Sequence, residues 1–331
     1  MIAMVLREAG GFLASECRPA PEPGPGEVRI RVEACAVCRT DLHLIDGELP
    51  QATYPVVPGH EVVGIVEALG PDVTEPRVGN RVGVPWLGHT CGHCSYCETG
   101  RENLCDAPGF TGCTRDGGFA THILAEAAFT IPLGSHLDPV ATAPLLCAGL
   151  IGWRTLRMAG EAGRVGLYGF GAAAHIVAQV CRWQGRRVFA LTRPGDRETQ
   201  TFARSVGAAW AGGTDEPLPE LLDAALIFAP DGGLVPTALK AVRKGGRVVC
   251  GGIHMSDIPA FPYDLLWGER AVLSVANLTR EDARSFFALV PQAGIVTHTR
   301  TYPLERANEA VADHRSGAFR GAAVLVPEPL T

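Results

Sequence analysis

The stretch VGLYGFGAAAHIVA, residues 165–178, determines the fold expected for the second half of the chain. Its first four residues are mostly apolar, as in a buried strand, and its last residues can begin a helix. Between them, Gly169, Gly171 and Ala174 form a G-x-G-x-x-A turn. Glycines at the first two positions let the backbone approach a pyrophosphate at the helix N-terminus. The order of strand, turn and helix therefore predicts a dinucleotide-binding βαβ unit.

The segments around this turn predict a parallel sheet. Short apolar runs at 165–168, 188–191, 224–228 and 248–250 alternate with segments that can form helices. Before residue 70 the patterns at 28–33 and 61–67 are typical of strands. The tail is expected to hold helices near 280–289 and 305–314 and a last strand at 322–326. We therefore predict an α/β fold, with a doubly wound Rossmann sheet and a second, mostly β domain.

The composition is that of a globular chain with two cores. A length of 331 residues exceeds the size at which one hydrophobic core usually stops growing. A hydrophobic fraction of 47% argues against disorder, and a net charge of -6 without a Lys/Arg run argues against a nucleic-acid partner. The N-terminus lacks a signal-peptide pattern, and no segment is apolar enough to span a bilayer. We expect a cytoplasmic protein without a membrane partner.

Eleven cysteines in such a chain point to metal binding, catalysis or burial, because a reducing compartment disfavours disulfides. Four of them follow the pattern C-x2-C-x2-C-x7-C in a polar loop: Cys91, Cys94, Cys97 and Cys105. This spacing predicts a structural zinc site, since closed sites take four sulfurs in a tetrahedron. An iron–sulfur cluster is the alternative, but the proline of the bacterial ferredoxin pattern is missing. His89 and His93 lie in the same loop and are expected to be bystanders.

The residues after the second strand of the parallel sheet favour one dinucleotide. NAD-binding folds place Asp or Glu roughly 20 residues after the first glycine, where it binds the ribose hydroxyls. Here that place falls near Arg193 (193 − 169 = 24), and it holds no acid. Thr192 and Arg193 could instead receive a 2′-phosphate. NADP(H) is therefore the preferred cofactor, while Asp196 leaves NAD(H) possible.

Five motifs follow one another along the chain: CRTDLH at 38–43, PGHE at 58–61, the four-cysteine loop, LCAG at 146–149 and RGAAVLV at 320–326. In this order the sequence resembles the zinc-dependent medium-chain alcohol dehydrogenases over nearly its whole length. The resemblance implies a discontinuous, GroES-like catalytic domain at 1–148 and 276–331 around a Rossmann domain at 149–275. It also implies hydride transfer between NADP(H) and a primary alcohol or aldehyde.

The same resemblance implies a second, catalytic zinc, so that each chain would hold two. Its ligands would be Cys38, His60 and Cys147, with Glu61 beside the metal. Three protein ligands leave one position open, and an alcohol bound there becomes more acidic. Asp41 matches the carboxylate that orients the ligating histidine. Thr40 and His43 match a relay that carries the proton to solvent.

Further roles are implied for residues around the cofactor and the substrate. Two arginines would contact the pyrophosphate, Arg39 and Arg320, and the pair Ala229 and Pro230 would lie near the nicotinamide. The substrate would pass Thr40, Leu49 and Trp86. Leu49 stands where several short-alcohol enzymes carry tryptophan, which favours medium-chain or aromatic substrates. A homo-oligomer, dimer or tetramer, is expected.

Three other functions remain open at this level. A zinc-free enoyl or quinone reductase would not be expected to keep Cys38, His60 and Cys147 together. An NADPH-dependent reductase of a conjugated C=C bond that retains zinc is harder to exclude. A non-catalytic zinc-binding interaction protein would explain the four-cysteine loop, but neither the glycine turn nor the pair of Thr40 and His43. Zinc content, measured together with NADPH turnover, distinguishes these functions: two zinc ions per chain together with turnover favour the dehydrogenase.

Overall fold

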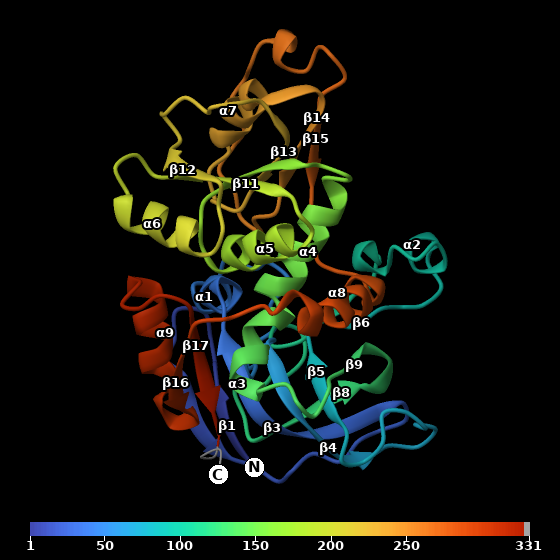
Figure 1. Ribbon diagram of the computed structural model, residues 1–331. Coiled ribbons are helices and arrows are strands. Elements are labelled where there is room, and N and C mark those ends of the chain that lie inside the picture. Colours follow the sequence, from blue (N-terminus) through green and yellow to red (C-terminus); the bar gives the residue numbers. More distant parts are fainter. Residues whose placement is uncertain (328–331) are drawn as a thin grey trace. The chain divides into compact units, whose positions relative to one another are not determined.

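The chain forms two compact units (Figure 1). The computed structural model describes residues 1–327. The first unit comprises Met1–Cys147 with 277–287 and the segment from Val296 onward, and the second comprises Ala148–Ala276 with Ala288–Ile295. Binding of zinc by the first unit and of a dinucleotide by the second remain predictions.

The first unit is built on a seven-stranded sheet in the order β16-β17-β3-β4-β5-β9, with β8 paired to β3. Its strands are β3 (Glu27–Val37), β4 (Val62–Leu69), β5 (Arg81–Val84), β8 (His122–Glu126), β9 (Ile131–Pro132), β16 (Thr299–Pro303) and β17 (Ala322–Val326). Two small antiparallel pairs accompany it: β1 (Ile2–Val5) with β2 (Ala14–Cys17), and β6 (Leu87–His89) with β7 (Gly109–Phe110). In β3, Val28, Ile30 and Val32 are buried in alternation, as expected for a strand with one face on the core.

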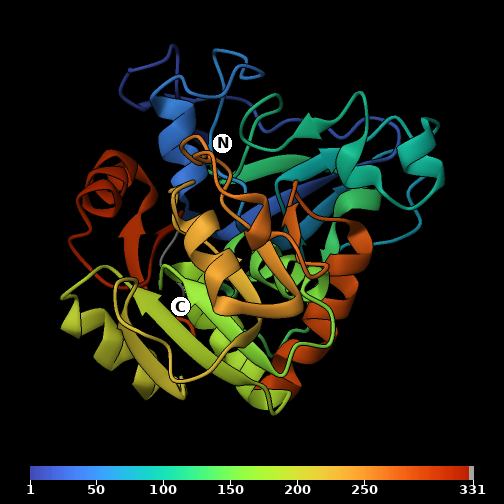
Figure 2. The ribbon, with the colours of Figure 1, turned by 90° about the horizontal axis from the view of Figure 1, so that it is seen from above.

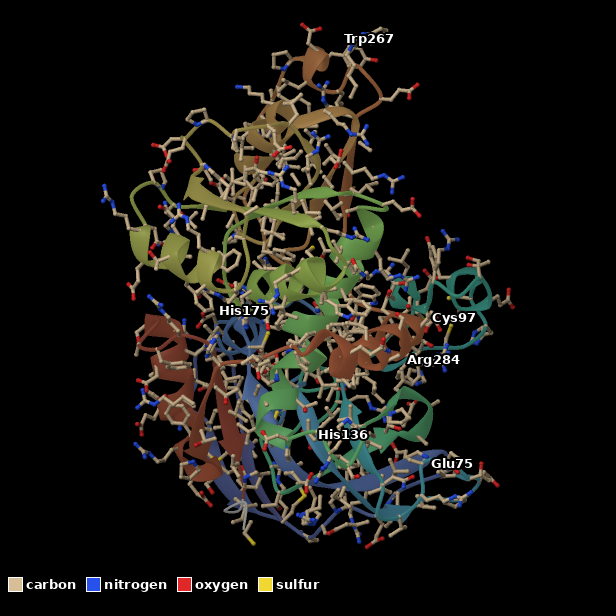
Figure 3. All side chains as sticks on the ribbon, in the orientation of Figure 1. Glu75, Cys97, His136, His175, Trp267 and Arg284 are labelled. Carbon is tan, nitrogen blue, oxygen red and sulfur yellow. The ribbon has the colours of Figure 1, made fainter. Side chains whose placement is uncertain are left out.

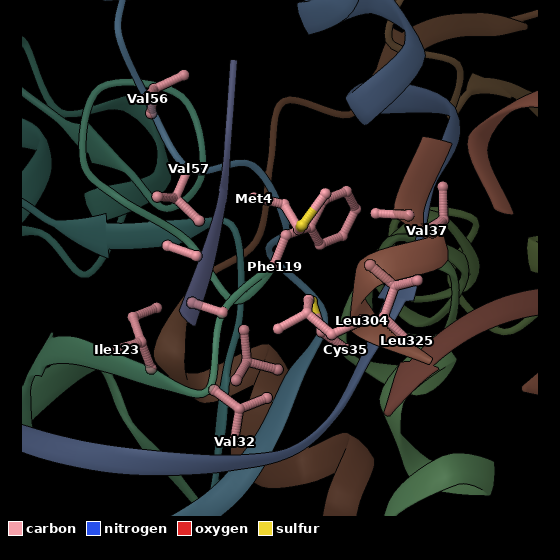
Figure 4. Close-up of a cluster of buried hydrophobic side chains, with 14 of the residues drawn as sticks. Met4, Val32, Cys35, Val37, Val56, Val57, Phe119, Ile123, Leu304 and Leu325 are labelled. Atoms are coloured by element: carbon pink, nitrogen blue, oxygen red, sulfur yellow. The ribbon is translucent and has the colours of Figure 1, made fainter. Parts of the chain in front are cut away.

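The core of the first unit joins segments that are distant in the sequence. Met4 from β1 and Phe119 lie beside one another, and Cys35 and Leu325 from β3 and β17 belong to the same cluster (Figure 4). Phe119 is fully buried. Because this cluster fixes the ends of β3 and the loop before β4, it determines where Cys38 and His60 lie.

Short helices close the first unit. They are α1 (Arg39–Ile45), α2 (Ser95–Glu98), α3 (Pro139–Thr142) and α9 (Ala307–Ser316), with 3-10 turns at Glu102–Leu104, Ala127–Phe129, Ala143–Leu146 and Leu304–Arg306. Helix α8 (Arg280–Ala293) begins in this unit and ends in the second. Helix α1 follows β3 directly, which makes it the element that carries the predicted motif at 38–43.

The second unit is a six-stranded parallel sheet in the order β12-β11-β10-β13-β14-β15. Its strands are β10 (Arg164–Tyr168), β11 (Arg187–Thr192), β12 (Trp210–Gly213), β13 (Leu222–Ile227), β14 (Val242–Cys250) and β15 (Ala271–Ser274), and a 3-10 turn covers Tyr263–Leu265. Its helices are α4 (Ala148–Met158), α5 (Ala172–Trp183), α6 (Arg197–Ser205) and α7 (Leu234–Ala241). Helix α5 lies on one face of the sheet and α7 on the other (Figure 1), and the view from above places α7 over the strands (Figure 2).

The predicted α/β class is confirmed. The apolar runs at 165–168, 188–191, 224–228 and 248–250 form β10, β11, β13 and β14, and the chain returns from β12 to β13 beside β10. In such a doubly wound sheet ligands bind at the carboxyl ends of the strands where the order reverses. The short strands β12 and β15 were not expected from the sequence. Within residues 1–327, no helix has the length and apolar character required to cross a membrane.

Candidate metal centres and cofactor turn

The four-cysteine loop brings its thiols together. The sulfur of Cys91 lies 4.0 Å from that of Cys97 and 3.5 Å from that of Cys105, and the Cys94 and Cys97 sulfurs are 3.6 Å apart. Four sulfurs about 2.3 Å from a central zinc ion would be separated by roughly 3.8 Å. The observed spacings lie on both sides of that value, so the donor set fits a closed zinc site. Figure 3 labels Cys97 on this loop.

Backbone N–H groups donate to the sulfurs of this cluster and favour the thiolate form of Cys94, whereas burial raises the pKa of Cys105 to about 11. The N–H groups of Cys94 and Ala107 donate to the sulfurs of Cys91 and Cys105, at 3.4 Å each. Hydrogen bonds from backbone N–H groups of Asp106 and Cys97 lower the pKa of the Cys94 thiol to about 6. A lowered thiol pKa favours the form that binds metal.

The two histidines of the loop have other contacts. His89 Nδ1 lies 2.7 Å from Glu126 Oε1, and His93 Nδ1 lies 2.7 Å from the carbonyl oxygen of Cys91. These nitrogens therefore contact groups other than the four sulfurs. The expectation that both are bystanders stays a prediction for the metal-bound protein.

The loop is also held from outside by a contact that the sequence did not reveal. Glu102, which is buried, accepts hydrogen bonds from the backbone N–H and the guanidinium of Arg280, at 2.9 and 3.2 Å. Arg280 is the first residue of α8, so the carboxylate also faces the positive end of that helix. Despite its burial, the contacts with Arg280 lower the pKa of Glu102.

A second cluster of possible metal ligands combines three distant segments. One ligand atom from each of Cys38, His60, Glu61 and Cys147 lies within 4.8 Å of the others. Cys38 precedes α1, His60 and Glu61 precede β4, and Cys147 precedes α4. The sulfurs of Cys38 and Cys147 are 3.5 Å apart. The fold therefore assembles the residues that the resemblance indicated.

The buried polar atoms of this cluster require a partner. Nε2 of His60 and Oε2 of Glu61 are buried without a hydrogen-bond partner among residues 1–327, and Nδ1 of His60 has only a contact of 3.3 Å with the Asp41 carboxylate. Burial raises the pKa of the Glu61 carboxyl well above its usual range. Unpaired buried polar groups are costly, and a cation bound by two thiolates and an imidazole would remove that cost. The residues thus fit a zinc ion.

Asp41 joins both sides of this cluster. Its Oδ2 accepts the backbone N–H of Cys38 at 2.8 Å, and its Oδ1 accepts that of Gly59 at 3.2 Å. Oδ1 also lies 3.3 Å from Nδ1 of His60. On the other side, the Trp86 ring packs edge-on against the His60 ring, with centroids 4.9 Å apart. One carboxylate therefore fixes the backbone before both ligands, and an aromatic ring limits rotation of the imidazole.

Glycines allow the His60 loop to pack so closely, a feature that sequence reasoning missed. Gly59 has a φ of 98°, and an added Cβ would lie 2.4 Å from the Phe119 ring. A Cβ on Gly117 would lie 2.2 Å from the Gly59 carbonyl oxygen. Only residues without a side chain permit this approach of two backbones. The positive φ and the close contact could not be inferred from one sequence.

The expected relay residues lie one turn apart on α1. The Thr40 hydroxyl is 3.7 Å from the Cys38 sulfur, and His43 follows at position i+3, on the same face of the helix. His43 Nδ1 pairs with the carboxylate of Glu48, a residue that the sequence did not single out. Leu49 and Trp86, expected in the substrate pocket, are buried in the core cluster of the first unit. Their contact with substrate remains a prediction.

The glycine turn has room for a phosphate. Gly169 has a φ of 83°, and a Cβ there would lie 3.0 Å from Ala229. Gly171 is the N-cap of α5, and no described atom lies within 4 Å of the Cβ it would carry. Ala174 is fully buried in the first turn of α5. Open backbone N–H groups at a helix N-terminus fit the pyrophosphate of a dinucleotide. Pro230, after β13, is exposed.

The end of β11 carries the residues expected to receive a 2′-phosphate. Thr192 is buried, and its hydroxyl donates within 3.3 Å to Gly212 and accepts from Gln200 at 3.1 Å. Its contact with a 2′-phosphate remains a prediction. Asp196 caps α6 by accepting the Thr199 N–H at 3.0 Å. Arg193 is exposed, as are Arg39 and Arg320 in the first unit.

Comparison with known proteins agrees with this geometry. Residues 24–135 match the alcohol dehydrogenase GroES-like domain. A Mycobacterium tuberculosis protein named "Probable alcohol dehydrogenase AdhA" is 46% identical over 314 residues, which cover 92% of this chain and 90% of that protein. The chain belongs to the zinc-dependent medium-chain alcohol dehydrogenase family.

Two solved structures share the fold of this alcohol dehydrogenase. The cobalt- and zinc-bound thermostable alcohol dehydrogenase of Pyrobaculum aerophilum has 25% identity and a TM-score of 0.88, with 99% of each chain covered. A dehydrogenase of Sinorhizobium meliloti 1021, assigned as zinc-binding and solved with NADP bound, has 26% identity and a TM-score of 0.89, with 98% of this chain and 99% of that chain covered. The protein is therefore an oxidoreductase of the alcohol dehydrogenase type.

Proposed function

We propose that this enzyme uses zinc to transfer a hydride between NADP(H) and a primary alcohol or aldehyde, with medium-chain or aromatic substrates preferred. The observation that carries the proposal is the cluster of Cys38, His60, Glu61 and Cys147, in which the histidine and the glutamate are buried. Its donor set of two thiols and one imidazole leaves a coordination position for substrate, whereas the four thiols of the loop form a closed site. A count of two zinc ions per chain follows.

The chain's own residues would prepare the reaction in three ways. A zinc ion, when bound, makes the hydroxyl of the substrate more acidic. Asp41 would keep the His60 ring oriented, because its carboxylate lies 3.3 Å from Nδ1. Thr40 would take the proton from the substrate hydroxyl and pass it toward His43, which would release it to solvent. Leu49 and Trp86 would exclude water and contact the carbon chain of the substrate.

The preference for NADP(H) rests on the end of β11. Arg193 is exposed there, and Asp196 already accepts a hydrogen bond as the cap of α6. A guanidinium binds a 2′-phosphate through charge-assisted hydrogen bonds, while an acid would repel it. NADP in the Sinorhizobium meliloti structure supports this assignment. The pyrophosphate would lie at Gly169 and Gly171.

We also propose a cytoplasmic homo-oligomer. None of the eleven cysteines forms a disulfide, a state that a reducing compartment maintains. In the described sheet of the second unit, β15 is an edge strand whose residues 271–274 carry no charge. Trp267, which precedes it and is labelled in Figure 3, is 67% exposed. Uncharged edge strands with apolar neighbours favour pairing with another copy.

The experiment that tests the function is a turnover screen of the zinc-loaded protein. Primary alcohols and aldehydes of increasing chain length, benzyl and cinnamyl alcohols, and substrates with a conjugated C=C bond are each combined with NADP(H) and NAD(H). Oxidation of primary alcohols with NADP⁺ is expected. Exclusive reduction of conjugated C=C bonds would overturn the proposal in favour of an enoyl or quinone reductase. If the protein bound two zinc ions and turned over none of these substrates, a non-catalytic zinc-binding interaction protein would become the better explanation. The similarity to alcohol dehydrogenases argues against that alternative.

A further inference from the structure

We propose that Glu48 is a positioning residue for proton release, which holds the His43 ring with its proton on Nδ1 and leaves Nε2 to receive the proton from substrate. This inference rests on the proposed function, because it takes His43 as the residue that carries the proton outward. It adds a residue to that path. Glu48 itself touches neither substrate nor metal in this scheme.

The contact between the two side chains defines the tautomer. Nδ1 of His43 and Oε2 of Glu48 form a hydrogen bond. An ionised carboxylate can only accept, so Nδ1 must be the donor. In a neutral imidazole the other nitrogen, Nε2, then carries no proton and has the lone pair that can accept one. The His43 side chain is 16% exposed and that of Glu48 51%, so the pair lies where the protein meets solvent.

The backbone after α1 explains why Glu48 reaches back to His43. The Glu48 N–H donates to the His43 carbonyl at 2.9 Å, and the Gly47 N–H donates to that of Leu44 at 3.2 Å. These two bonds, with Gly47 at a φ of 76°, form a Schellman motif that ends the helix. A Cβ on Gly47 would also lie 2.9 Å from the Ala9 side chain. The position of Glu48 relative to the ring is therefore fixed by the main chain.

Two carboxylates act on the His43 ring: Asp46 interacts with it electrostatically, and Glu48 is the one hydrogen-bonded to it. Asp46, on the same turn, receives two hydrogen bonds of 2.7 Å from Arg315 of α9. Arg315 lowers the pKa of Asp46 and compensates its charge. The remaining titratable groups on these elements are Arg39 and Asp41 on α1, Glu309, Asp313 and His314 on α9, and Glu8, which precedes the loop packed against Gly47.

The proton balance needs no further reactant. The proton of the substrate hydroxyl passes through Thr40 to Nε2 of His43, which becomes an imidazolium ion. The Glu48 carboxylate stabilises that charge through Nδ1–H, as a carboxylate behind a catalytic histidine does. The same proton then leaves Nε2 to water. The Nδ1 proton stays on the ring throughout, so the starting tautomer is restored.

The test compares Glu48→Leu, Glu48→Gln, His43→Gln and the double variant that combines Glu48→Leu with His43→Gln, as zinc-loaded enzymes. Glu48→Leu should lower kcat for alcohol oxidation roughly tenfold at neutral pH, part of the factor of 10²–10⁴ that a positioned base contributes. KM for alcohol and zinc content should not change, and higher pH should restore part of the rate. Glu48→Gln retains an oxygen that accepts from Nδ1–H, so its loss should be smaller.

Nitrogen-15 NMR of histidine-labelled enzyme supplies a readout independent of activity. The His43 signal, identified by its disappearance in His43→Gln, should report the Nδ1–H tautomer in wild type and a mixture in Glu48→Leu. Wild-type kinetics in Glu48→Leu beside a slow His43→Gln would overturn the role of Glu48 while leaving the relay intact. Normal kinetics in His43→Gln would overturn the relay as well. A rate loss from Glu48→Leu that persists in the His43→Gln background would place its effect elsewhere and also overturn the inference.

Discussion

Replacement of Asp41 by Asn should weaken zinc binding at the site of Cys38, His60 and Cys147. The two carboxylate oxygens of Asp41 accept the backbone N–H groups of Cys38 and Gly59 at 2.8 and 3.2 Å. Asparagine keeps one acceptor and turns an NH2 group toward the other N–H, which leaves a buried donor without a partner at a cost of about 1–3 kcal/mol. Loss of a carboxylate beside a ligating histidine typically lowers metal affinity roughly 10–100-fold.

A chelator competition on zinc-loaded protein measures this affinity, and thermal unfolding of the same samples checks the fold. Asp116→Asn is the matched control, because Asp116 accepts the backbone N–H of Val57 at 2.9 Å in the loop that leads to His60. The control should retain wild-type zinc affinity. If Asp41→Asn also retained it, Asp41 would be a backbone brace without influence on the metal.

Three further changes test other parts of the molecule. Arg193→Asp should raise KM for NADPH about tenfold or more, because one charge-assisted hydrogen bond to the 2′-phosphate is lost, and it should improve the use of NADH. An equal rise of KM for NADPH and NADH would contradict this. Asp223→Asn should lower the stability of the second unit by roughly 1 kcal/mol or less at neutral pH, since its arginine partners are half-exposed. These partners hold the pKa of Asp223 well below its value in the unfolded chain. The difference in unfolding free energy between wild type and Asp223→Asn, measured with urea, should therefore shrink below about pH 4. If this difference grew at low pH, the ion pair would not be its cause. Glu102→Ala should destabilise the four-cysteine loop by about 1–3 kcal/mol, which would be measured as faster release of zinc to a chelator. Glu98→Ala changes an exposed position of the same loop and should release zinc at the wild-type rate.

Elements that depend on residues adjacent in the chain could be predicted from the sequence. The turn of Gly169 and Gly171 could be predicted because strand, turn and helix are contiguous. Strands β12 and β15, of four residues each, are too short for periodicity to reveal, and tertiary pairing decides them. The helix expected at 305–314 begins with a 3-10 turn and becomes α-helical from Ala307 to Ser316.

The candidate sites divide in the same way. The four-cysteine loop is local, and its spacing alone predicted the cluster. Cys38 and Cys147 are separated by 109 positions, so only the family resemblance could connect them. The pairing of His43 with Glu48 depends on a helix-ending motif whose left-handed glycine cannot be distinguished from an ordinary loop glycine in one sequence. The burial of Thr192 could not be predicted, because burial of a hydroxyl at a strand end depends on the neighbouring strand and helix.

The central claim is that the site of Cys38, His60 and Cys147 is catalytic and that the four-cysteine loop is structural. The most direct test measures zinc content and alcohol oxidation on the same preparations of wild type, Cys147→Ala and Cys97→Ala. Wild type should hold about two zinc ions per chain. Cys147→Ala should retain about one, unfold like wild type and lose turnover, whereas Cys97→Ala should mainly lose stability. Full activity in Cys147→Ala would contradict the account.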